Sequence, residues 1–491
     1  MKQTYFTALL AILLATNALS LYKRDTPAVV KLDVRHDQAP DSVKRNYQKR
    51  KRDDTVTQVL QNAGTMYLTN MTLGSPPQRV RLIVDTGSSD TWCNTNSSDL
   101  CSQEPGICYQ LGTYNANSSS TYKYLNSGFE LAYVDGTSAQ GDYVSDNLTI
   151  GGKTLPGFEF GVAYTSSSTG VLGLGYVGSE ATRKSKQGNY PNLPQAMVDN
   201  GLITSNAYSL WLDDLDADTG SILFGGVDTE KYVGKLQTVS ILQIPGENPQ
   251  FRINMSGLAL SVNGSIEATY GHTSLPAPAV LDSGTSLTVL PEPIVASIFQ
   301  DLNGTYVTQN PGFIPCSLIN EDIRLNFTFS TASVSVRIKE MMTSTRPGAT
   351  MKDGTQGCAL GIVPTSGHSS VLGDTFLRSA YVVYDMDNNE ISLANTNFNA
   401  SSSGDGGGGS VLEIGATVPG ATMVSSSVTT ATSAVETSPS SVQKSTSAAT
   451  STASESSASS AVVSRGMLSK EPCTILFVVC LAILVELFGF L

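Results

Sequence analysis

The sequence predicts an all-β protein of two similar lobes, with a central catalytic cleft between them and a few short helices. Short aliphatic or alternating stretches such as QRVRLIVD, YVSDNLTI and AYVVYDMDNNEISLA fill residues 53 to 398, and turn-forming residues separate them. A faint internal repeat indicates two lobes, because LIVDTGSSDTW returns as AVLDSGTSLTV and TGVLGLG returns as SSVLGDTFL. Related β lobes that face each other across a cleft would produce this pattern.

Two segments carry the features of short helices within this β-rich region. PNLPQAMVDNGLI (191 to 203) and PEPIVASIFQDL (291 to 302) each begin with proline and place aliphatic residues at helical spacing. We therefore expect a folded domain over 53 to 398, with one lobe over about 53 to 235 and the other over about 236 to 398.

The N-terminal segment is typical of a secreted precursor. Residues 1 to 20 combine a basic residue, an apolar run and small residues before a cleavage point, which predicts a signal peptide. A membrane anchor is the alternative, but the apolar run is too short to span comfortably. Three clusters of Lys and Arg follow, the last at 49 to 52, and in a secreted chain they favour processing sites. We expect a propeptide over 21 to 52.

The composition changes at Ser401. A glycine-rich run leads into a stretch of Ser, Thr, Ala and Val that cannot form a core, so residues 401 to 466 are expected to be a disordered, O-glycosylated stalk. Residues 467 to 491, which are apolar from 473 onward apart from Glu486 and have small residues upstream, have the arrangement of a GPI-attachment signal that is removed on maturation. A tail-anchored helix is the alternative. Ser460, Ser464 and Gly466 all suit lipid attachment, and the anchored protein would reside at the plasma membrane or be linked to wall glycan.

Composition excludes several functions. The chain has 30 Lys and Arg against 42 Asp and Glu, a formal charge of -12, which argues against a nucleic-acid binder. Its three histidines, His36, His272 and His368, form no zinc-binding pattern, so we expect no metal and no organic cofactor. No nucleophile-elbow or catalytic-cysteine motif accompanies these histidines either.

Cysteines and sequons agree with an oxidising, secretory route. The predicted disulfides are Cys101–Cys108 and Cys316–Cys358, while the pairing of Cys93 stays open. The chain also contains nine N-x-[ST] sequons, which fit a glycoprotein. Their asparagines are Asn70, Asn96, Asn117, Asn147, Asn254, Asn263, Asn303, Asn326 and Asn399.

Three Asp-[Thr/Ser]-Gly turns occur, and their flanking residues separate them. Asp85 follows Leu-Ile-Val and Asp282 follows Ala-Val-Leu, so each turn should end a buried strand. Asp218 follows an acidic stretch and precedes a new strand, which is typical of an ordinary hairpin turn. The sequence therefore predicts that Asp85 and Asp282 are catalytic and that Asp218 is only part of a turn.

Two such aspartates suit the hydrolysis of an amide. Carboxylates held a few ångström apart cannot both ionise readily, so one proton is shared between them. The charged member takes a proton from water, and the other acts on the carbonyl oxygen and later helps the amine to leave. Because the proton belongs to the pair, neither Asp85 nor Asp282 is a permanent acid.

The residues after each aspartate support this chemistry. Gly87 and Gly284 allow close approach of the backbone. The hydroxyls of the catalytic loops have two expected tasks, bracing the loops and bonding the outer carboxylate oxygens. Thr86 and Ser283 are assigned to the first task, and Ser88 and Thr285 to the second.

Residues 53 to 398 resemble a pepsin-type aspartic protease. DTGSSDTW and LDSGTSLTVLP match the two catalytic motifs of that family, and YVVYDMDNNEISLA matches its closing strands. With the precursor segments, the stalk and the apolar tail, the chain is similar to the fungal GPI-anchored yapsin-type members. The resemblance implies a zymogen that becomes an aspartic endopeptidase, working best below neutral pH on polypeptide substrates, and we expect it to be a monomer.

The resemblance also implies a β-hairpin flap over the cleft, and residues 129 to 144 fit it. Tyr133 would shield the substrate and hydrogen-bond Trp92, with Gly136 in the flap turn. The family usually has Tyr-Gly-x-Gly, so Val134 departs from the pattern. In fungal relatives an aspartate at the position of Asp135 accompanies Lys or Arg before the cleaved bond, and a carboxylate there would pair with a cation. Core packing for the aromatic pair and a solvated turn for Asp135 are the alternatives.

Two other functions suit the same fold. One is a cell-wall adhesin or structural glycoprotein, and the other is a ligand-binding inhibitor of proteases. Both are disfavoured by two intact catalytic motifs. Inhibition by a statine-type transition-state mimic would separate the enzyme from both.

Overall fold

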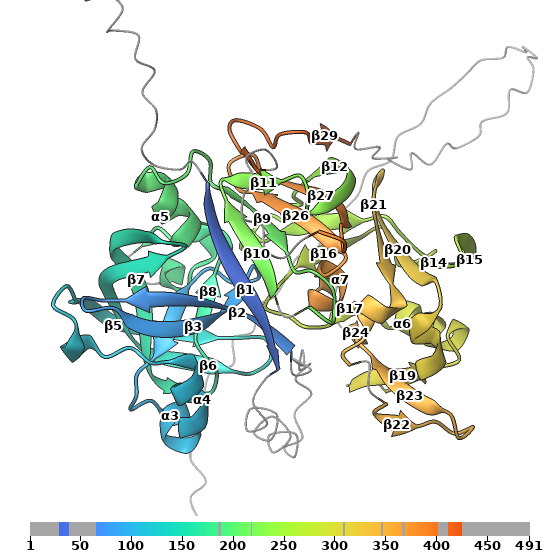
Figure 1. The fold of residues 1–491 in the computed structure, drawn as a ribbon, viewed down its shortest axis with the longest axis horizontal. Helices are drawn as coiled ribbons and strands as arrows, with labels where there is room; N and C mark the ends of the chain where they lie inside the picture. Colours follow the sequence, from blue (N-terminus) through green and yellow to red (C-terminus); the bar gives the residue numbers. More distant parts are fainter. Residues whose placement is uncertain are drawn as a thin grey trace, which may run out of the picture. The chain divides into compact units, whose positions relative to one another are not determined.

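The structure is a computed structural model (Figure 1) that describes residues 29–38, 65–184, 188–217, 219–307, 310–344, 347–365, 369–400 and 411–424. The predicted signal peptide, most of the predicted propeptide, the GPI signal, Asp218 and His368 lie outside these ranges. Within them, no helix has both the length and the apolar character that a membrane span requires.

Strands dominate the fold, as predicted, and the largest sheet has fourteen. In spatial order they are β29 (Thr422–Met423), β12 (Tyr232–Ser240), β27 (Glu390–Thr396), β26 (Ala380–Asp385), β9 (Ala207–Trp211), β10 (Thr219–Phe224), β1 (Val30–Gln38), β2 (Thr65–Leu73), β3 (Gln78–Asp85), β8 (Val171–Gly173), β4 (Thr91–Asn94), β7 (Lys153–Ser166), β6 (Ser138–Ile150) and β5 (Lys123–Ala132).

The second half of the chain adds smaller sheets. One sheet contains β13 (Arg252–Met255), β16 (Ala277–Leu281), β25 (Ser370–Leu372), β17 (Thr288–Pro291) and β24 (Ile362–Thr365). Another contains β15 (Ser265–Tyr270), β14 (Gly257–Val262), β20 (Ile323–Phe329) and β21 (Ala332–Arg337). The remaining two are formed by β18 (Thr305–Val307), β19 (Asn310–Pro315), β23 (Gln356–Leu360) and β22 (Ala349–Thr350), and by β11 (Gly226–Asp228) with β28 (Val411–Glu413).

In the part of the chain that the structure describes, helices are few and short, as the sequence predicts. They are α3 (Asp99–Gln103), α4 (Pro105–Leu111), α5 (Leu193–Asp199), α6 (Glu292–Asp301) and α7 (Asp374–Leu377), joined by the 3₁₀ turns η2 (Ala116–Ser118), η3 (Val177–Ser179), η4 (Ala181–Lys184), η5 (Cys316–Asn320) and η6 (Ile338–Met341). The two proline-initiated segments become α5 and α6. In Figure 1 elements of the first half, such as β5 and β7, lie on one side, and α6 and β19 lie on the other.

Alternation of apolar and polar residues explains why these segments are strands. In β20, Ile323, Leu325, Phe327 and Phe329 are buried, while the residues between them are partly exposed. Successive side chains of a strand point to opposite faces, so this pattern buries one face against the core.

The internal repeat corresponds to the same strand arrangement in both halves. β3 runs parallel to β8, which pairs antiparallel with β4. In the second half β16 runs parallel to β25, which pairs antiparallel with β17. The strands before the two catalytic motifs, β3 and β16, therefore occupy equivalent positions.

Residues expected in the propeptide form part of the sheet. β1 lies between β10 and β2, with Val34 opposite both Gly220 and Thr69. Its alternate residues Val30, Leu32 and Val34 are buried in the main core. The folded body thus begins before residue 53, because VKLDVRH has the alternation that a half-buried strand needs.

Part of the predicted stalk is also folded, which corrects the expectation of disorder from residue 401 onward. Residues 411 to 424, here called the C-terminal strap, pair through β28 with β11 and through β29 with β12. Ile414, Val418 and Val424 are buried, the first two in a cluster with Trp211 and Tyr381. The serine-rich composition hid these apolar residues, which cover the outer face of β9, β26 and β27.

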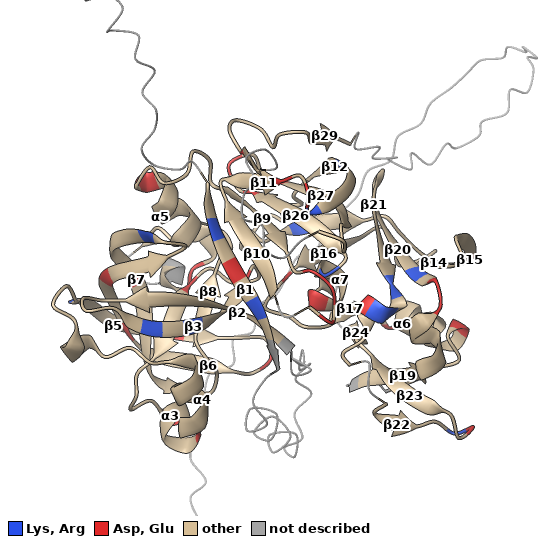
Figure 2. Cartoon of the chain, viewed as in Figure 1, with Lys and Arg blue, Asp and Glu red and all other residues tan. Residues whose placement is uncertain are grey.

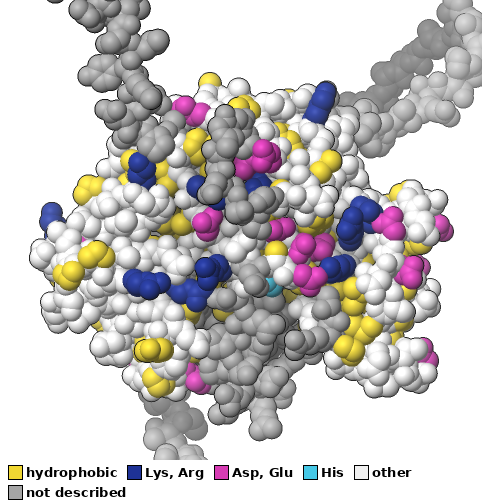
Figure 3. Space-filling model, in the orientation of Figure 1, with side chains coloured by type: hydrophobic (Ala, Val, Ile, Leu, Met, Phe, Trp, Pro, Cys, Tyr) yellow, Lys and Arg dark blue, Asp and Glu magenta, His cyan; other side chains and the backbone are white. Residues whose placement is uncertain are grey.

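Both expected disulfides are present. Cys101 is bonded to Cys108 and Cys316 to Cys358. Cys93 is a buried free thiol, so the pairing that the sequence left open is absent. Charged residues are interspersed, with Lys and Arg in small separate groups on several elements (Figure 2) and acidic and basic side chains mixed on the face drawn in Figure 3.

The strap should contribute to the stability of the folded body. A chain that ends at Asn399 loses the strap, and a chain that ends at Val428 keeps it. Each of the three buried aliphatic residues is worth about 1.5–3 kcal/mol, so we expect the shorter chain to lose several kcal/mol in free energy of unfolding. Urea denaturation of the two chains measures this difference.

A matched pair of substitutions provides the control. Ile414 is fully buried and Leu412, two residues earlier, is 40% exposed. Ile414→Ala should cost about 2–4 kcal/mol and Leu412→Ala under about 1 kcal/mol. Equal stability of all four proteins would show that the strap is not part of the folded body.

Candidate active site

Each of two strands ends at one of the catalytic-motif aspartates. Asp85 is the last residue of β3, and Asp282 follows directly on β16. Asp85 is buried, and the backbone around both residues is held by neighbouring strands. Leu174 N–H donates to the Asp85 carbonyl at 2.8 Å, and Asp282 N–H donates to the Leu372 carbonyl at 3.1 Å. The sequence-predicted pair therefore lies on two rigidly placed turns.

A crossed set of hydrogen bonds joins the two turns. Thr86 N–H donates to Ser283 Oγ at 3.1 Å, and Ser283 N–H donates to Thr86 Oγ1 at 3.0 Å. The same hydroxyls donate onward, Thr86 Oγ1 to the Leu281 carbonyl at 3.0 Å and Ser283 Oγ to the Val84 carbonyl at 2.9 Å. Every donor and acceptor is buried, so each hydroxyl accepts one bond and donates another across the two halves.

Each carboxyl group is oriented by its own turn. Gly87 N–H and Ser88 Oγ donate to the two oxygens of Asp85, at 2.8 and 2.5 Å. Gly284 N–H donates to Asp282 Oδ1 at 2.8 Å, and Thr285 Oγ1 donates to Asp282 Oδ2 at 2.7 Å. The two halves thus repeat one set of contacts, in which Ser88 and Thr285 each donate to the carboxyl group of their own turn.

Glycine is required because each carboxyl lies against the other turn. A Cβ on Gly87 would stand 2.5 Å from Asp282 Oδ1, and a Cβ on Gly284 would stand 2.3 Å from Asp85 Oδ1. Real Cβ atoms do not approach other atoms so closely. Each carboxyl group therefore lies directly against the glycine of the opposite turn, so the two carboxyl groups face each other.

Electrostatics favour one proton on this pair. Burial raises the pKa of Asp85 well above its ordinary value, and the charge of Asp282 raises it further. The hydrogen bonds from Ser88 and Gly87 oppose the rise. The pair can therefore keep a proton at a pH where an isolated aspartate is ionised.

A second hydrogen bond, present in both halves, holds the backbone of each catalytic turn. Gly175 N–H donates to the Ser88 carbonyl at 2.8 Å, and Asp374 N–H donates to the Thr285 carbonyl at 2.8 Å. Gly373 permits this approach, because a Cβ there would lie 2.1 Å from the Thr285 carbonyl oxygen. Gly173, which ends the matching run of the first half, permits a similar approach, because a Cβ there would lie 2.5 Å from the Ser89 carbonyl carbon. Each apolar-apolar-Gly run thus ends in a glycine that a close backbone contact requires, a role that the sequence did not reveal.

The predicted flap is a hairpin of β5 and β6, and Tyr133, just after β5, lies close enough to Asp85 to feel its charge. Trp92 Nε1–H donates to the Tyr133 hydroxyl at 2.8 Å. Burial raises the pKa of Tyr133 beyond its usual range, the Asp85 charge adds to the rise, and hydrogen bonds from Trp92 and Ser88 oppose it. Gly136 has φ of +82°, which glycine adopts readily, and Val134 is 71% exposed at the tip.

Asp135 has a structural role in this turn. Its Oδ1 accepts hydrogen bonds from Thr137 N–H at 2.8 Å and Thr137 Oγ1 at 2.7 Å. These contacts stabilise the hairpin tip in the manner of an Asx turn. They occupy Oδ1 alone, so the turn role and a role in substrate recognition are compatible.

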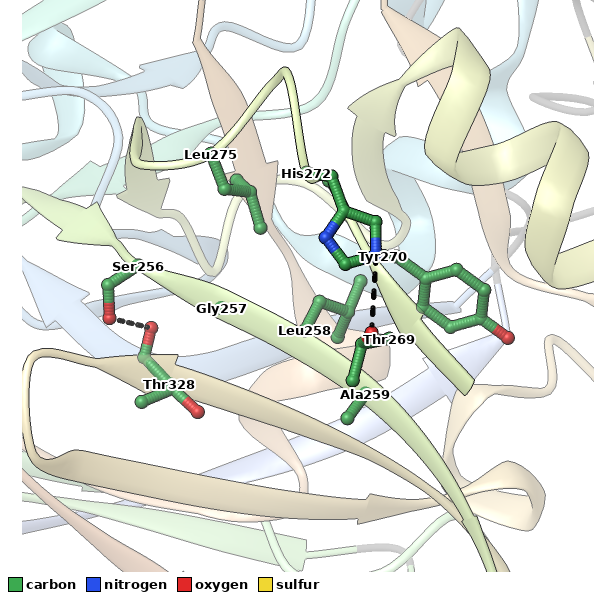
Figure 4. Close-up of a pocket in the computed structure, with 10 residues that line it drawn as sticks. Ser256, Gly257, Leu258, Ala259, Thr269, Tyr270, His272, Leu275 and Thr328 are labelled. Carbon is green, nitrogen blue, oxygen red and sulfur yellow. Dashed lines mark hydrogen bonds between the residues drawn. The ribbon is translucent and has the colours of Figure 1, made fainter. Parts of the chain in front are cut away.

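The structure also has a pocket on the sheet of β14 and β15, and no residue of the catalytic turns or the flap lines it. Ser256, Tyr270 and His272 are among its lining residues (Figure 4), and Thr269 Oγ1 lies 3.3 Å from His272 Nε2. Tyr270 donates to Asp301 at 2.8 Å. In the described ranges no group of His, Cys, Asp and Glu has the arrangement of a metal site.

Two buried carboxyl groups near the flap escaped the sequence analysis. Asp90 accepts hydrogen bonds from Tyr143 and Tyr190, and Glu180 accepts one from the Tyr190 amide. Asp90 lies inside the quoted motif DTGSSDTW, so its position was visible. Its tyrosine partners are distant in sequence, so no local pattern could have indicated their contact.

Comparisons with known proteins show what the chain is similar to. The family model "Eukaryotic aspartyl protease" matches residues 66–396. The chain is 49% identical over 438 residues to "Probable aspartic-type endopeptidase opsB" of Aspergillus oryzae, covering 88% of each chain. It is 34% identical over 385 residues to "Aspartic proteinase yapsin-3" of Saccharomyces cerevisiae, covering 75% of this chain and 72% of the relative.

A solved structure supports the fold. The aspartic proteinase from Irpex lacteus superimposes with a TM-score of 0.55 and 20% identity, covering 76% of this chain and 99% of that chain.

The glycines of the two turns give a direct test of the facing carboxyls. Gly87→Ala should reduce peptide cleavage by about 100-fold or more, because the new methyl group displaces the Asp282 carboxyl. Gly284→Ala should do the same through Asp85. A progress-curve assay on a chromogenic peptide measures the rates, and thermal melting checks that the variants fold.

Gly106→Ala is the matched control. Gly106 lies in α4, and a Cβ there meets nothing within 4 Å. It should leave activity unchanged and stabilise the helix slightly. Full activity of Gly87→Ala would contradict the described arrangement of the carboxyl pair.

Proposed function

The chain belongs to the eukaryotic aspartyl protease family and is an aspartic-type endopeptidase, and from this premise we propose that it is a secreted, GPI-anchored monomer with some preference for basic residues before the cleaved bond. The observation that carries the catalytic part is the crossed Thr86–Ser283 brace, which holds two carboxyl groups face to face.

The residues act on a peptide bond as follows. The ionised member of Asp85 and Asp282 removes a proton from a water molecule, which attacks the peptide carbonyl carbon. The protonated member donates to the carbonyl oxygen, so negative charge does not build up on it. The proton taken from water then passes to the leaving nitrogen as the C–N bond breaks, and a hydroxyl of the tetrahedral intermediate returns its proton to the other carboxylate, so the pair again holds one proton. Ser88 and Thr285 keep both carboxyls in orientation throughout.

The flap supplies the second part of the mechanism. Tyr133, held by Trp92, would close over the peptide and keep bulk water from the reacting bond. Val134 presents an apolar side chain at the tip, where the glycine common in the family would present none. We propose that this residue makes the flap stiffer and adds an apolar contact to substrate.

Preference for Lys or Arg is proposed from the flap carboxyl. Asp135 uses Oδ1 to stabilise the turn, so Oδ2 is available to a cationic side chain. The chain as a whole carries a formal charge of -12, which also favours cationic peptides over long range.

Secretion and anchoring are proposed from the ends of the chain. Support comes from the apolar run within residues 1 to 20, the apolar segment at 473 to 491, and the two disulfides. The processing that we propose after residue 52 has a structural requirement. It would release β1, so another segment must then cover β2 and β10, or β1 must stay bound after cleavage.

Asp135→Asn tests the basic preference without disturbing the turn. Asparagine keeps an oxygen for the Thr137 bonds and removes only the charge. We expect kcat/KM for a peptide with Lys before the scissile bond to fall about 10-fold, while the matching Leu peptide is unaffected. An unchanged ratio would leave Asp135 as a turn residue only.

Asp142→Asn is the charge-matched control. Asp142 lies on β6 and accepts a hydrogen bond from the Tyr164 hydroxyl. The variant Asp142→Asn also removes one negative charge, but at a position away from the flap tip. It should leave the ratio of kcat/KM for the Lys and Leu peptides unchanged.

Phospholipase treatment tests the anchor. A phosphatidylinositol-specific phospholipase should release the full-length protein from membranes, and a chain that ends at Val428 should be found in the medium without treatment. Retention after complete lipid cleavage would point to a protein helix as the anchor or to a covalent link with wall glycan.

A further inference from the structure

Behind the flap lie two buried carboxyl groups that the cleavage reaction does not use. Asp90 is 3% exposed and Glu180 is 2% exposed. Across the described part of the chain, the ion pairs join other residues, and neither carboxyl has a cationic partner. Buried acids are normally neutralised by a cation or by protonation, so this pair needs a physical explanation.

Asp90 is a point where three donors converge. The hydroxyls of Tyr143 and Tyr190 donate to Oδ1, at 3.0 and 2.9 Å. The amide of Ala181 donates to Oδ2 at 2.9 Å. An ionised carboxylate only accepts hydrogen bonds, so this set of donors suits the charged form.

Glu180 differs from Asp90 in its contacts. Its Oε2 accepts from the Tyr190 amide at 2.9 Å, while its buried Oε1 has no hydrogen-bond partner. Burial raises the pKa of Glu180 to about 9, and the charge of Asp90 contributes. Glu180 is therefore protonated throughout the acidic range, and Asp90 is the member of the pair that can change charge there.

The tyrosines on Asp90 connect it to the flap. Tyr143 packs edge-on against Tyr190, with ring centroids 5.7 Å apart, and edge-on against Phe129 at 5.3 Å. Phe129 lies 6.0 Å from Trp92, which donates its indole hydrogen to Tyr133. These residues form one cluster, here called the flap wall, against which Tyr133 packs.

We propose that Asp90 is a positioning residue for substrate binding, whose carboxylate holds the flap wall in place through Tyr143 and Tyr190 and so places Tyr133 over the peptide. Asp90 touches neither the peptide bond nor the reacting water; it acts through the aromatic contacts. The proposal rests on the peptide-cleaving function and on the flap role of Tyr133.

A pH dependence of binding follows from the same contacts. Burial raises the pKa of Asp90, and the three hydrogen bonds oppose the rise. The groups that face Asp90 are the hydroxyls of Tyr143 on β6 and Tyr190 before α5, the amide of Ala181 on η4, and the carboxyl of Glu180. Three of the roughly four lone-pair sites of the carboxylate are used, so protonation can take the remaining site on Oδ2. It removes the charge that strengthens the bonds from both tyrosine hydroxyls, so the wall loosens.

The experiment measures KM and kcat separately against pH, with the full folded chain and one chromogenic peptide. For the unmodified enzyme, KM should rise about 10-fold as pH falls through the titration of Asp90. Asp90→Asn mimics the protonated form. Its KM should be high and independent of pH, while the basic limb of kcat, which belongs to the catalytic pair, stays where it was.

Asp146→Asn is the matched control, because Asp146, which lies on β6, is another buried carboxyl group. It accepts from the Tyr114 hydroxyl at 2.7 Å and from Thr121 Oγ1, and it lies outside the flap wall. This variant should lower the melting temperature and leave the pH dependence of KM unchanged. A profile altered as in Asp90→Asn would show a general stability effect and overturn the proposal.

Tyr190→Phe gives a second route that does not require Asp90→Asn to fold. It keeps the ring and removes one donor to Asp90, so the carboxylate is less stabilised and the KM inflection should move to higher pH. An unmodified enzyme whose KM does not vary with pH, or an unmoved inflection in Tyr190→Phe, overturns the proposal. If the unmodified enzyme cleaves no peptide, the proposed function itself has failed.

Discussion

The structure depends on one buried contact, the reciprocal hydrogen bonds between Thr86 and Ser283. These bonds join residues 197 positions apart and fix the distance between two turns that belong to different halves of the chain. The two carboxyl groups have no freedom to separate, because each lies against the glycine of the other turn. Without this brace, two buried acids would move apart or recruit a cation, and the shared proton would be lost.

The strands and turns around the brace are also repeated in the two halves of the chain. β3 with β8 and β16 with β25 deliver the turns on equivalent parallel pairs, and the amides of Gly175 and Asp374 donate to equivalent carbonyls, those of Ser88 and Thr285. The flap is the asymmetric addition. It comes from the first half, and its tyrosine is placed by an aromatic cluster that ends on the buried carboxylate of Asp90. Catalytic geometry and substrate closure thus have separate supports.

How much of this could be predicted from the sequence depended on the range of each interaction. The strands, the proline-initiated helices and the two aspartate turns follow from local patterns, so they could be read directly. The ends of the folded body could not, because β1 is stable only between β10 and β2, and the strap only against Trp211 and Tyr381. From its sequence position β1 was assigned to the propeptide, and from its composition the strap was assigned to the disordered stalk. The contact of Asp90 with Tyr190 joins residues 100 positions apart, which no local signal could indicate.

The pH dependence of kcat tests the shared proton most directly. Ser88 lowers the pKa of Asp85 by hydrogen bonding to its carboxylate, so Ser88→Ala should raise that pKa and let the pair keep its proton to higher pH. Comparing the unmodified enzyme with Ser88→Ala over the full active range measures this. The account predicts that the basic limb moves upward by about one pH unit. A basic limb that stays at the same pH in the variant would contradict a single proton held between Asp85 and Asp282.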